Sequence, residues 1–506
     1  MFKQLLAIVL SCLILLSATA CSGGTEESSV PDKNTVTTTT NASTESGEPT
    51  DSDVSTELTE SGSSTDVTGE STTSTSGQST NAPTKTNSNT QKTTTTTKKK
   101  PAGSKSIVWW TTDLGGAANK HLNNGLNDFE TSSGIAVDVY IQSATGGTIT
   151  SFDDKFIPAM SAGNGPDVVS FNSPSADYAV DLTTKLSEGF WSQFFPVIRD
   201  GLKTGGKYYA VPNIVSVNGL LCYSKLDFKN AGLDPNTPPT TIAELDQMAE
   251  KLYIANATGD GYEQVGFYPW YWLLLEYPSL LIKPFGGSWT NAEGYPTANS
   301  SEVIAALEWM MSYADKYGAD KVSNSLGKLV NENNSYGHSV AMIPSFSAGL
   351  NAMAKNGDKA SEWGISVFPG VDSKHNGLAL GTASMSLVKG TDKEAEALKF
   401  LEFYATTFQE NYYVKYYQDF GSYSPNQAAW KKHLNSMDGF TKMMYENVLT
   451  QAKADPQTTT QKKYTTPATY MTLVKNSISK ILEGKVEIKA EMDSLQRKIV
   501  ALTKEK

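Results

Sequence analysis

Aromatic and short polar side chains are the residues of this sequence whose types and spacing could do chemistry. The candidates for contact with a ligand are Trp109, Trp110, Asp113, Asn172, Trp270, Trp272, Trp289, Phe346 and Tyr423. Trp and Tyr rings pack on flat apolar faces, whereas Asp, Asn and Ser hydrogen-bond hydroxyl groups. This combination favours non-covalent binding of a ligand with apolar faces and polar edges, such as a sugar. The alternative for each aromatic residue is a place in the core.

The spacing of the tryptophans indicates which of them could contact a ligand together. Trp109 and Trp110 are neighbours on a predicted strand, so they point to opposite sides and at most one faces a ligand. Trp110 is closer to the carboxyl end of that strand and is the better candidate. Trp270 and Trp272 share one side if their segment is extended, which would make a platform for adjacent sugar rings.

Motifs for covalent or metal-assisted catalysis are missing from the sequence. The 4 histidines are far apart, and none stands in an H-E-x-x-H or zinc-type cysteine pattern. These residues are His121, His338, His375 and His433. No Walker A loop, G-x-G-x-x-G turn or G-x-S-x-G elbow occurs, and no carboxylate spacing indicates a glycosidase. We therefore expect no catalytic residue, cofactor or metal; a cell-surface enzyme acting on polysaccharide stays the alternative.

One stretch, Asn256–Gly261, resembles the first half of a calcium-binding loop. Its twelfth position is Phe267, where a complete loop carries a bidentate glutamate. We therefore expect a hairpin turn here and no metal site.

The segment Ser106–Pro174 must position the first ligand candidates, and its pattern reads strand, helix, strand, helix, strand. Ile107–Trp110 and Asp167–Phe171 are apolar runs, and polarity alternates over Ile135–Ile141. Apolar residues between these runs recur at helical spacing: Leu122, Leu126, Phe129, Phe152, Phe156 and Met160. This alternation predicts a parallel sheet with helices on its faces, in which ligands bind beyond the carboxyl ends of the strands. Two of the polar candidates, Asp113 and Asn172, follow the carboxyl ends of predicted strands.

Later segments predict further elements. We expect a strand that ends at Pro212, a second sheet beginning with residues 219–223, and a loop at Pro344–Ser347. Capping boxes predict helix starts at Thr241 with Glu244 and at Thr391 with Glu394. Helical spacing of apolar residues over Ser300–Tyr317 and Lys475–Lys498 indicates long helices near the middle and the end of the chain.

Four short motifs, in this order and spacing, resemble a known family. They are Gly163–Val169 (GNGPDVV), Tyr208–Pro212 (YYAVP), Leu220–Lys225 (LLCYSK) and Ala231–Leu233 (AGL). They are similar to motifs of the extracellular solute-binding proteins of bacterial ABC importers, in the family-1, sugar-binding branch. The resemblance covers Ser106 to the last residue, although the family's usual Tyr-Asn-Lys is Tyr-Ser-Lys here.

The resemblance implies an α/β, two-lobed, periplasmic-binding-protein-like (type II) fold, each lobe a mainly parallel sheet flanked by helices. Lobe 1 would comprise residues 106–212 and 381–424, and lobe 2 residues 213–380 and 425–506. Closure of the lobes would bury a carbohydrate, with an oligosaccharide favoured, for delivery to ABC transporter permease subunits. A binding protein for a different solute and a pure adhesion module are the alternatives.

The first residues have the pattern of a targeting signal. Lys3 precedes an apolar run, Leu5–Leu16, which is too short to span a membrane, and small residues lead into Cys21. We expect residues 1–21 to be a lipoprotein signal peptide and Cys21 to be acylated, with palmitate among its lipids. An ordinary secretory signal is the alternative. Cys222 would then be the single cysteine of the folded part, unable to form an internal disulfide.

Residues 22–105 have the composition of a linker. They are rich in Thr and Ser and contain no Phe, Trp or Tyr, so they cannot bury enough apolar surface to offset chain entropy. We expect a disordered stalk between the lipid and the folded part, on the extracellular face of the cell membrane. The net charge of −11 argues against nucleic acid as a partner. The remaining roughly 400 residues are enough for two units, and we expect a monomer.

Overall fold

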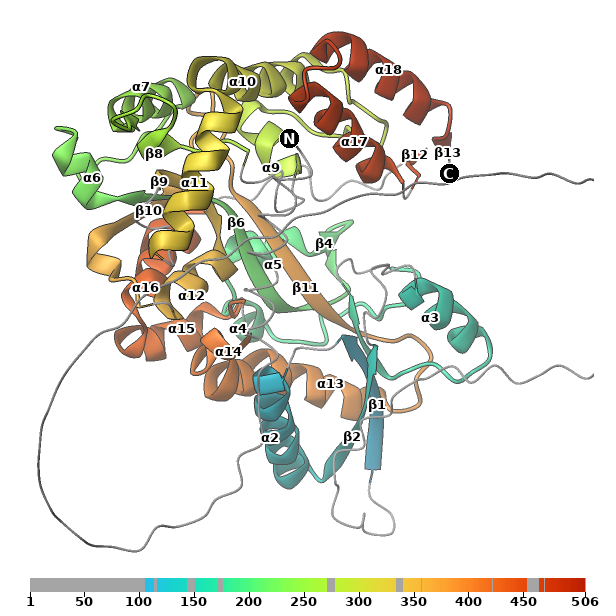
Figure 1. Ribbon diagram of the computed structural model, residues 1–506. Coiled ribbons are helices and arrows are strands. Elements are labelled where there is room, and N and C mark those ends of the chain that lie inside the picture. The colour runs from blue at the N-terminus through green and yellow to red at the C-terminus, as the bar shows by residue number, and fades with distance from the viewer. Residues whose placement is uncertain are drawn as a thin grey trace, which may run out of the picture. The chain divides into compact units, whose positions relative to one another are not determined.

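The amino-terminal part of the fold is the strand–helix alternation that the sequence predicts. In order come β1 (Lys105–Thr112), α2 (Gly116–Ser133), β2 (Ile135–Gln142), α3 (Ser151–Ser161) and β3 (Val168–Phe171). β1 lies between β2 and β3 and pairs with both in parallel. α2 buries Leu122, Leu126 and Phe129, as expected, and Gly134 follows it with a φ of 69°. Figure 1 shows α2, β1 and β2 together at one end of the molecule, with α3 to one side of them.

The computed structural model describes most of the chain beyond the predicted linker. The described residues are 105–112, 116–142, 151–171, 176–270, 278–333, 340–355, 357–420, 422–452, 464–467 and 469–505. The predicted signal peptide, with Cys21, and the predicted linker up to residue 104 lie outside them. No helix of the described part is both long and apolar enough to cross a bilayer.

One sheet connects the two ends of the folded part. Its strand order is β2-β1-β3-β11-β6-β9-β8-β7, and β10 also pairs with β6. The strands beyond β3 are β6 (Val211–Ser224), β7 (Ile254–Ala255), β8 (Tyr262–Phe267), β9 (Val340–Phe346), β10 (Trp363–Val367) and β11 (Ala379–Leu387). β11 is antiparallel to β3 and β6, β6 is antiparallel to β9 and β10, and β8 is parallel to β9. Pairing is therefore parallel at the β2-β1-β3 end and mixed beyond it.

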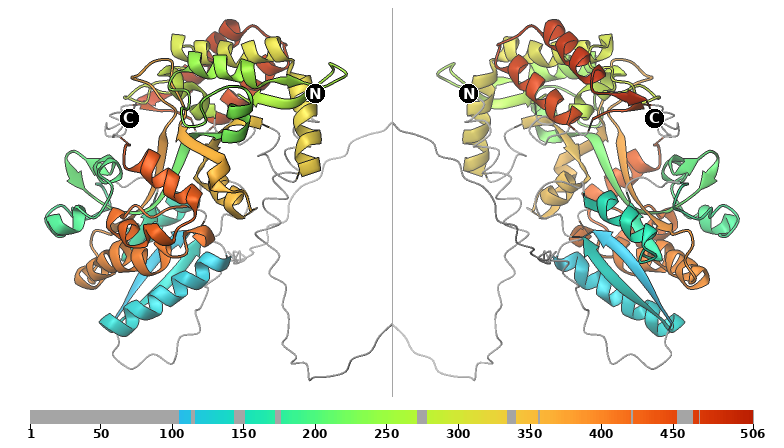
Figure 2. Two further views of the ribbon diagram at one scale, coloured as in Figure 1. Left: turned by 90° about the vertical axis from the view of Figure 1, so that its left-hand side faces the viewer. Right: turned by 90° about the vertical axis from the view of Figure 1, so that its right-hand side faces the viewer.

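Helices cover this sheet at both ends. Next to β1–β3 and the start of β6 are α4 (Glu188–Trp191), α5 (Pro196–Gly201), α13 (Glu394–Phe403), the π-helix η4 (Tyr404–Val414) and α14 (Tyr417–Phe420). The hairpin β4 (Lys203–Thr204) and β5 (Lys207–Tyr208) precedes β6. Figure 2 shows α2, β1 and β2 at one end and the carboxyl-terminal helices at the other, from two sides.

The other end is helix-rich. Its helices are α6 (Lys225–Asn230), α7 (Ile242–Leu252), α9 (Pro278–Ile282), η1 (Lys283–Phe285), α10 (Ser301–Tyr317), α11 (Ala319–Asn333), α12 (Ser347–Lys355), η3 (Ala360–Glu362), α15 (Gln427–His433), η5 (Leu434–Ser436), α16 (Gly439–Met444), η6 (Tyr445–Leu449), α17 (Tyr470–Leu482) and α18 (Ile488–Val500). A two-stranded sheet, β12 (Tyr464–Thr465) with β13 (Lys504–Glu505), ends the described chain. α10, α17 and α18 confirm the long helices predicted from apolar spacing.

Two hydrophobic cores share the main sheet. The first core packs β1, β3 and β11 against α2, α4, α13 and η4, and the second packs β6, β8, β9 and β10 against helices that include α7, α10, α16, α17 and α18. A small third cluster joins Phe156 of α3 to Val169 of β3 and Val388. The chain passes from one core to the other between adjacent residues: Phe194 is in the first core and Phe195 in the second, and Tyr413 and Val414 divide likewise. The lobe boundaries at residues 212, 380 and 424 stay a prediction. Cys222 is a buried free thiol of the second core.

Three local predictions were wrong. β6 begins at Val211 and runs on through Pro212, with a bulge that puts Pro212 opposite Ser384 and Ile214 opposite Ala383. Residues 219–223 continue β6 and do not begin a separate sheet. The predicted loop at Pro344–Ser347 is instead the end of β9 and the start of α12.

The two capping boxes had different outcomes. Thr241 and Glu244 exchange their hydrogen bonds at the start of α7, which confirms the first. The second was wrong, since Lys393 is the N-cap of α13 and makes no side-chain cap. The Thr391 hydroxyl instead donates to Asp167 and accepts from the Lys393 amide, 3.0 Å away.

Candidate functional site

A strip of half-exposed residues runs along β6 and β11 between the two cores. On β6, Val215 and Val217 are fully buried, while the residues between and beside them are partly exposed. β11 places a small residue opposite each of these exposed positions. Because directly paired residues lie on the same face of a sheet, they make one surface. We call it the central strip: Ile214, Ser216, Asn218, Ala379, Gly381 and Ala383.

The central strip is polar and closely fitted. The Ser216 hydroxyl donates to the Gly381 carbonyl, and the Asn218 amide donates to the Ser216 oxygen, both over 3.4 Å. A Cβ on Gly381 would lie only 2.4 Å from the Ser216 Oγ, so a larger residue here would displace the Ser216 hydroxyl. Phe346, at the end of β9, pairs opposite Asn218 and is half-exposed. The long hydrogen bonds are weak ones, which a ligand hydroxyl could replace.

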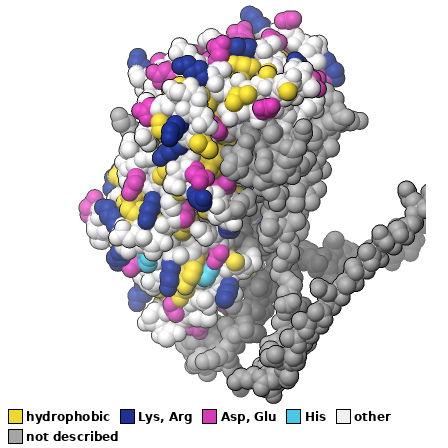
Figure 3. All heavy atoms as spheres, turned by 60° about the vertical axis from the view of Figure 1, so that its left-hand side comes forward, with side chains coloured by type: hydrophobic (Ala, Val, Ile, Leu, Met, Phe, Trp, Pro, Cys, Tyr) yellow, Lys and Arg dark blue, Asp and Glu magenta, His cyan; other side chains and the backbone are white. Residues whose placement is uncertain are grey.

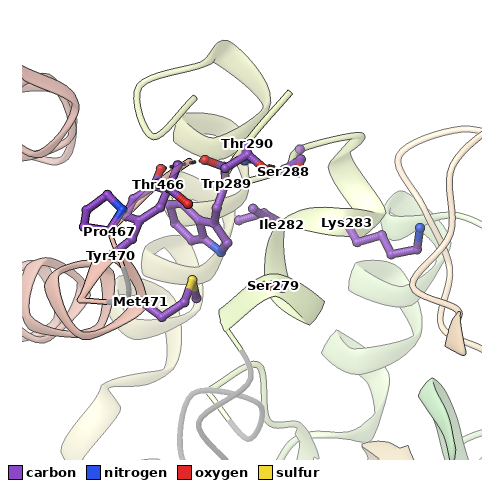
Figure 4. A pocket seen from close by; sticks show the side chains of 11 residues that line it. Ser279, Ile282, Lys283, Ser288, Trp289, Thr290, Thr466, Pro467, Tyr470 and Met471 are labelled. Atoms are coloured by element: carbon purple, nitrogen blue, oxygen red, sulfur yellow. Dashed lines mark hydrogen bonds between the residues drawn. The ribbon is translucent and has the colours of Figure 1, made fainter. Parts of the chain in front are cut away.

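A pocket of about 340 Å³ lies in the second of the two ends (Figure 4). One wall comes from α9, η1 and the loop after them, and the other from the segment before α17 and the first turn of that helix. The residues that line the pocket include Lys283, Trp289, Thr466, Pro467, Tyr470 and Met471. We call this the Trp289 pocket. Its volume is in the range of sites for small molecules.

Trp289 dominates the pocket. Its side chain is 5% exposed, and its indole Nε1–H has no hydrogen-bond partner. The Tyr470 hydroxyl donates to the Trp289 carbonyl over 2.6 Å, and the Thr297 amide donates to it over 3.1 Å. Burial raises the pKa of Tyr470, so this phenol stays a neutral donor. Figure 4 shows the indole beside Tyr470, Pro467 and Met471. The indole therefore lines the pocket with the small part of its surface that is exposed, and its buried Nε1–H has no partner among the described residues.

The comparison with known families decides the class of the protein. The family described as bacterial extracellular solute-binding protein matches residues 110–411. This chain belongs to that family. The recognition made from the four short motifs is confirmed. No curated protein matches the chain.

Solved structures similar to this solute-binding protein share its fold. CpMnBP1 with mannotriose bound is 24% identical, covers 78% of this chain and 100% of its own, and has a TM-score of 0.57. The sugar-binding protein MalE of Xanthomonas citri is 18% identical, with 78% and 97% covered and a TM-score of 0.58. Maltose-bound MalE3 of T. maritima is 18% identical, with 78% and 99% covered and a TM-score of 0.54. The α/β, two-lobed, periplasmic-binding-protein-like fold is confirmed.

Two predicted contact residues of the solute-binding protein belong to its cores. Trp109 is 0% exposed, stacks edge-on with Phe400 and Tyr404 at 5.4 and 5.3 Å, and donates from its Nε1 to Ser170. Tyr423 is also 0% exposed, and its hydroxyl donates to Asn351 over 3.0 Å. Neither ring has a free face in this structure, and a ligand contact of these two residues stays a prediction.

Other candidates keep some access or have an unused donor. Trp110 is half-exposed and packs edge-on against Phe156, on the side of the sheet opposite Trp109. Trp270 is 4% exposed, packs on Tyr268, and has no partner for its buried Nε1–H. Phe346 joins the central strip, and Trp289 forms the pocket. Asp113, Asn172 and Trp272 lie outside the described residues, so the proposed platform of Trp270 with Trp272 stays a prediction.

The opposite wall of the Trp289 pocket has no local signature in the sequence. Thr466, Pro467, Tyr470 and Met471 stand about 180 residues after Trp289 and were predicted only as part of a segment leading into helices. Only the fold brings them to the indole. Neither local spacing nor residue type could have paired them.

The calcium-like stretch is a hairpin turn, as predicted. It connects the antiparallel strands β7 and β8. Asp260 accepts hydrogen bonds from Asn256 and Thr258, which lower its pKa, and Asn256 accepts from the Gly261 amide. These oxygens are satisfied inside the turn. Among the described residues, no three His, Cys, Asp or Glu side chains are grouped to hold a metal ion.

Proposed function

We propose that this solute-binding protein captures a carbohydrate, with an oligosaccharide favoured, and delivers it to the permease of an ABC importer. The Trp289 pocket carries the proposal. Its indole lines the pocket and would pack against a sugar ring, and its buried Nε1–H, which has no partner among the described residues, would become a donor if ligand entry or closure exposed it. Hydroxyl-bearing residues of the lining, such as Thr466, would meet polar edges of the ring.

The similar structures support a sugar as the ligand class. CpMnBP1 was solved with mannotriose, and MalE3 with maltose. Those ligands belong to those proteins; for this chain they indicate which compounds to try first. Family membership supports an extracellular binding role, and no motif in the sequence favours catalysis instead.

Closure around the ligand is the proposed mechanism of capture. β6 and β11 run from one core to the other, and the register between them shifts at Ala383 and Ser384. Such a bulge is a point where a strand pair can bend. Bending would bring the two ends together over the central strip and give the permease a distinct shape to recognise.

A lipid anchor is proposed for the amino terminus. The apolar run ending at Cys21 would direct acylation of this cysteine, and residues 22–105 would serve as the stalk. Cys21→Ser should release the protein from the membrane fraction or leave its signal uncut. A mature amino terminus elsewhere, carrying no lipid, would refute the anchor.

A ligand screen tests the function. Residues 106–506 are mixed with mono- and oligosaccharides, including mannotriose and maltose, and the melting temperature is recorded. A ligand that binds only the folded state raises this temperature. Mass spectrometry of the mixture then separates binding from catalysis: the proposal expects a raised melting temperature and unchanged sugar. Conversion of the sugar would favour a polysaccharide-acting enzyme, and no shift with any sugar would favour another solute.

A further inference from the structure

The carboxyl-terminal helix α18 contacts the wall that carries Trp289. The Gln496 Oε1 accepts a hydrogen bond from the Ala298 amide over 2.8 Å, and its Nε2 donates to the Pro296 carbonyl over 2.7 Å. Ala298 is fully buried, so the Gln496 side chain satisfies an amide that solvent does not reach.

The loop that Gln496 contacts also carries Trp289. The loop 286–299 folds back on itself, with Thr290 bridged to Pro296 and the Thr297 amide donating to the Trp289 carbonyl. The Thr297 hydroxyl also donates to the Ser288 carbonyl over 2.6 Å. Gln496 therefore holds the second half of this loop, which in turn is hydrogen-bonded to the first half that carries Trp289.

The strand after α18 contacts the opposite wall. β13 pairs in antiparallel fashion with β12, so that Lys504 is opposite Thr465 and Glu505 opposite Tyr464. The next two residues, Thr466 and Pro467, line the pocket. β13 thus pairs with the segment that leads directly into this wall.

β13 follows α18 after a short turn. Three hydrogen bonds hold this turn against the end of α18: from the Leu502 amide to the Ile499 carbonyl, from the Thr503 amide to the Val500 carbonyl, and from the Thr503 hydroxyl to the Ile499 carbonyl. Met492, Leu495 and Ile499 anchor α18 in the second core. A single carboxyl-terminal unit therefore reaches both walls of the pocket.

We propose that α18 and β13 are a frame that positions the two walls of the Trp289 pocket, with Gln496 and the backbone amide of Lys504 as the positioning groups. Neither group is among the residues that line the pocket. The frame sets the spacing between the indole and the Thr466–Pro467 segment, and through it the affinity for a sugar ring. The effect on affinity rests on the proposed function, whereas the positioning of the walls does not.

Antiparallel pairs alternate between hydrogen-bonded and non-hydrogen-bonded residues, which supplies a matched pair of variants. The Tyr464 amide already donates to the Glu293 carbonyl over 2.8 Å. We therefore assign the ladder hydrogen bonds to Thr465 and Lys504. Lys504→Pro should break the ladder, whereas Glu505→Pro should spare it, and Lys504→Ala should keep the amide and lose only the charge.

The test compares hydrogen–deuterium exchange of the ligand-free domain in wild type, Gln496→Met, Lys504→Pro and their controls. Arg497→Met, an exposed change on the same helix, is the control for Gln496. The frame predicts faster exchange over 288–298 in Gln496→Met and over 464–471 in Lys504→Pro, and wild-type exchange in the controls. Exchange unchanged in both variants, or equally raised in the controls, would overturn the proposal, whether or not any sugar binds.

Calorimetry with the sugar found in the screen gives the second readout. Each of the two variants should bind about tenfold more weakly, the change that 1.4 kcal/mol makes, with a melting temperature close to that of wild type. Wild-type affinity despite faster exchange would remove the role in ligand positioning. If the wild type binds no sugar at all, the proposed function fails while exchange still decides the frame.

Discussion

Trp109 and Trp110 are neighbours on β1 but have different surroundings, because successive side chains of a strand face opposite sides of the sheet. α13 and η4 cover the side on which Trp109 lies. The fold puts Phe400 and Tyr404 against Trp109 and so makes it a core residue.

Replacing the two tryptophans should separate their roles. Trp109→Ala should lower the free energy of unfolding by about 3–5 kcal/mol, because a fully buried ring leaves a cavity. Trp110→Ala should cost clearly less, since its ring is partly exposed. Urea unfolding of both variants measures the difference. Equal losses would contradict the assignment of Trp109 alone to the core.

Asp167, in the Gly-Pro-Asp motif, has a structural role in the described protein. Its carboxylate accepts from the Val108 amide over 2.7 Å and from the Thr391 hydroxyl, and Lys393 lies 3.6 Å away. It therefore joins β1, β3 and the segment before α13. Asp167→Ala should lower stability by about 1–3 kcal/mol, since these donors lose their acceptor. Thr391→Val should lose only part of that amount in the same unfolding assay; a larger loss in Thr391→Val would contradict this account.

At the scale of elements, the periodic segments were predictable and the connections between distant segments were not. Apolar spacing predicts α2, β2, α10, α17 and α18, because burial on one face is a local requirement. The strand end predicted at Pro212 was wrong, because β6 pairs there through a bulge with β11, which comes far later in the chain. The capping box predicted at Thr391 does not form, because the Thr391 hydroxyl donates to Asp167, which is distant in sequence. The wall opposite Trp289 was not predictable either, because its residues are also distant in sequence from Trp289.

An ion pair near the β4–β5 hairpin gives a pH prediction. Hydrogen bonds from Thr183, followed by those from Lys207, lower the pKa of Asp181 to about 2 from 3.8. A depressed folded-state pKa adds stability above the unfolded value, and this stability is lost as the pH falls from about 4 through about 2. Asp181→Asn should therefore be less stable than wild type near pH 6 but lose less on acidification in that window. Parallel stability curves for the two proteins would contradict it.

At the scale of the whole molecule, the two-core arrangement around β6 and β11 predicts a change of shape. Saturating ligand should make residues 106–506 more compact, measured by small-angle scattering, because closure brings the two ends together. The domain mixed with a sugar that fails in the screen serves as the control. An unchanged scattering curve with bound ligand would indicate a rigid binding module.

The central claim is that a sugar binds against the indole of Trp289, and one calorimetric titration tests it most directly. Trp289→Phe keeps an aromatic face and removes the unpaired Nε1–H, while Trp109→Phe makes the same change in the first core. The account predicts saturable binding to wild type and to Trp109→Phe, and binding weakened by about tenfold or more in Trp289→Phe, as for loss of about 1.4 kcal/mol or more. Equal affinity of wild type and a folded Trp289→Phe would contradict it.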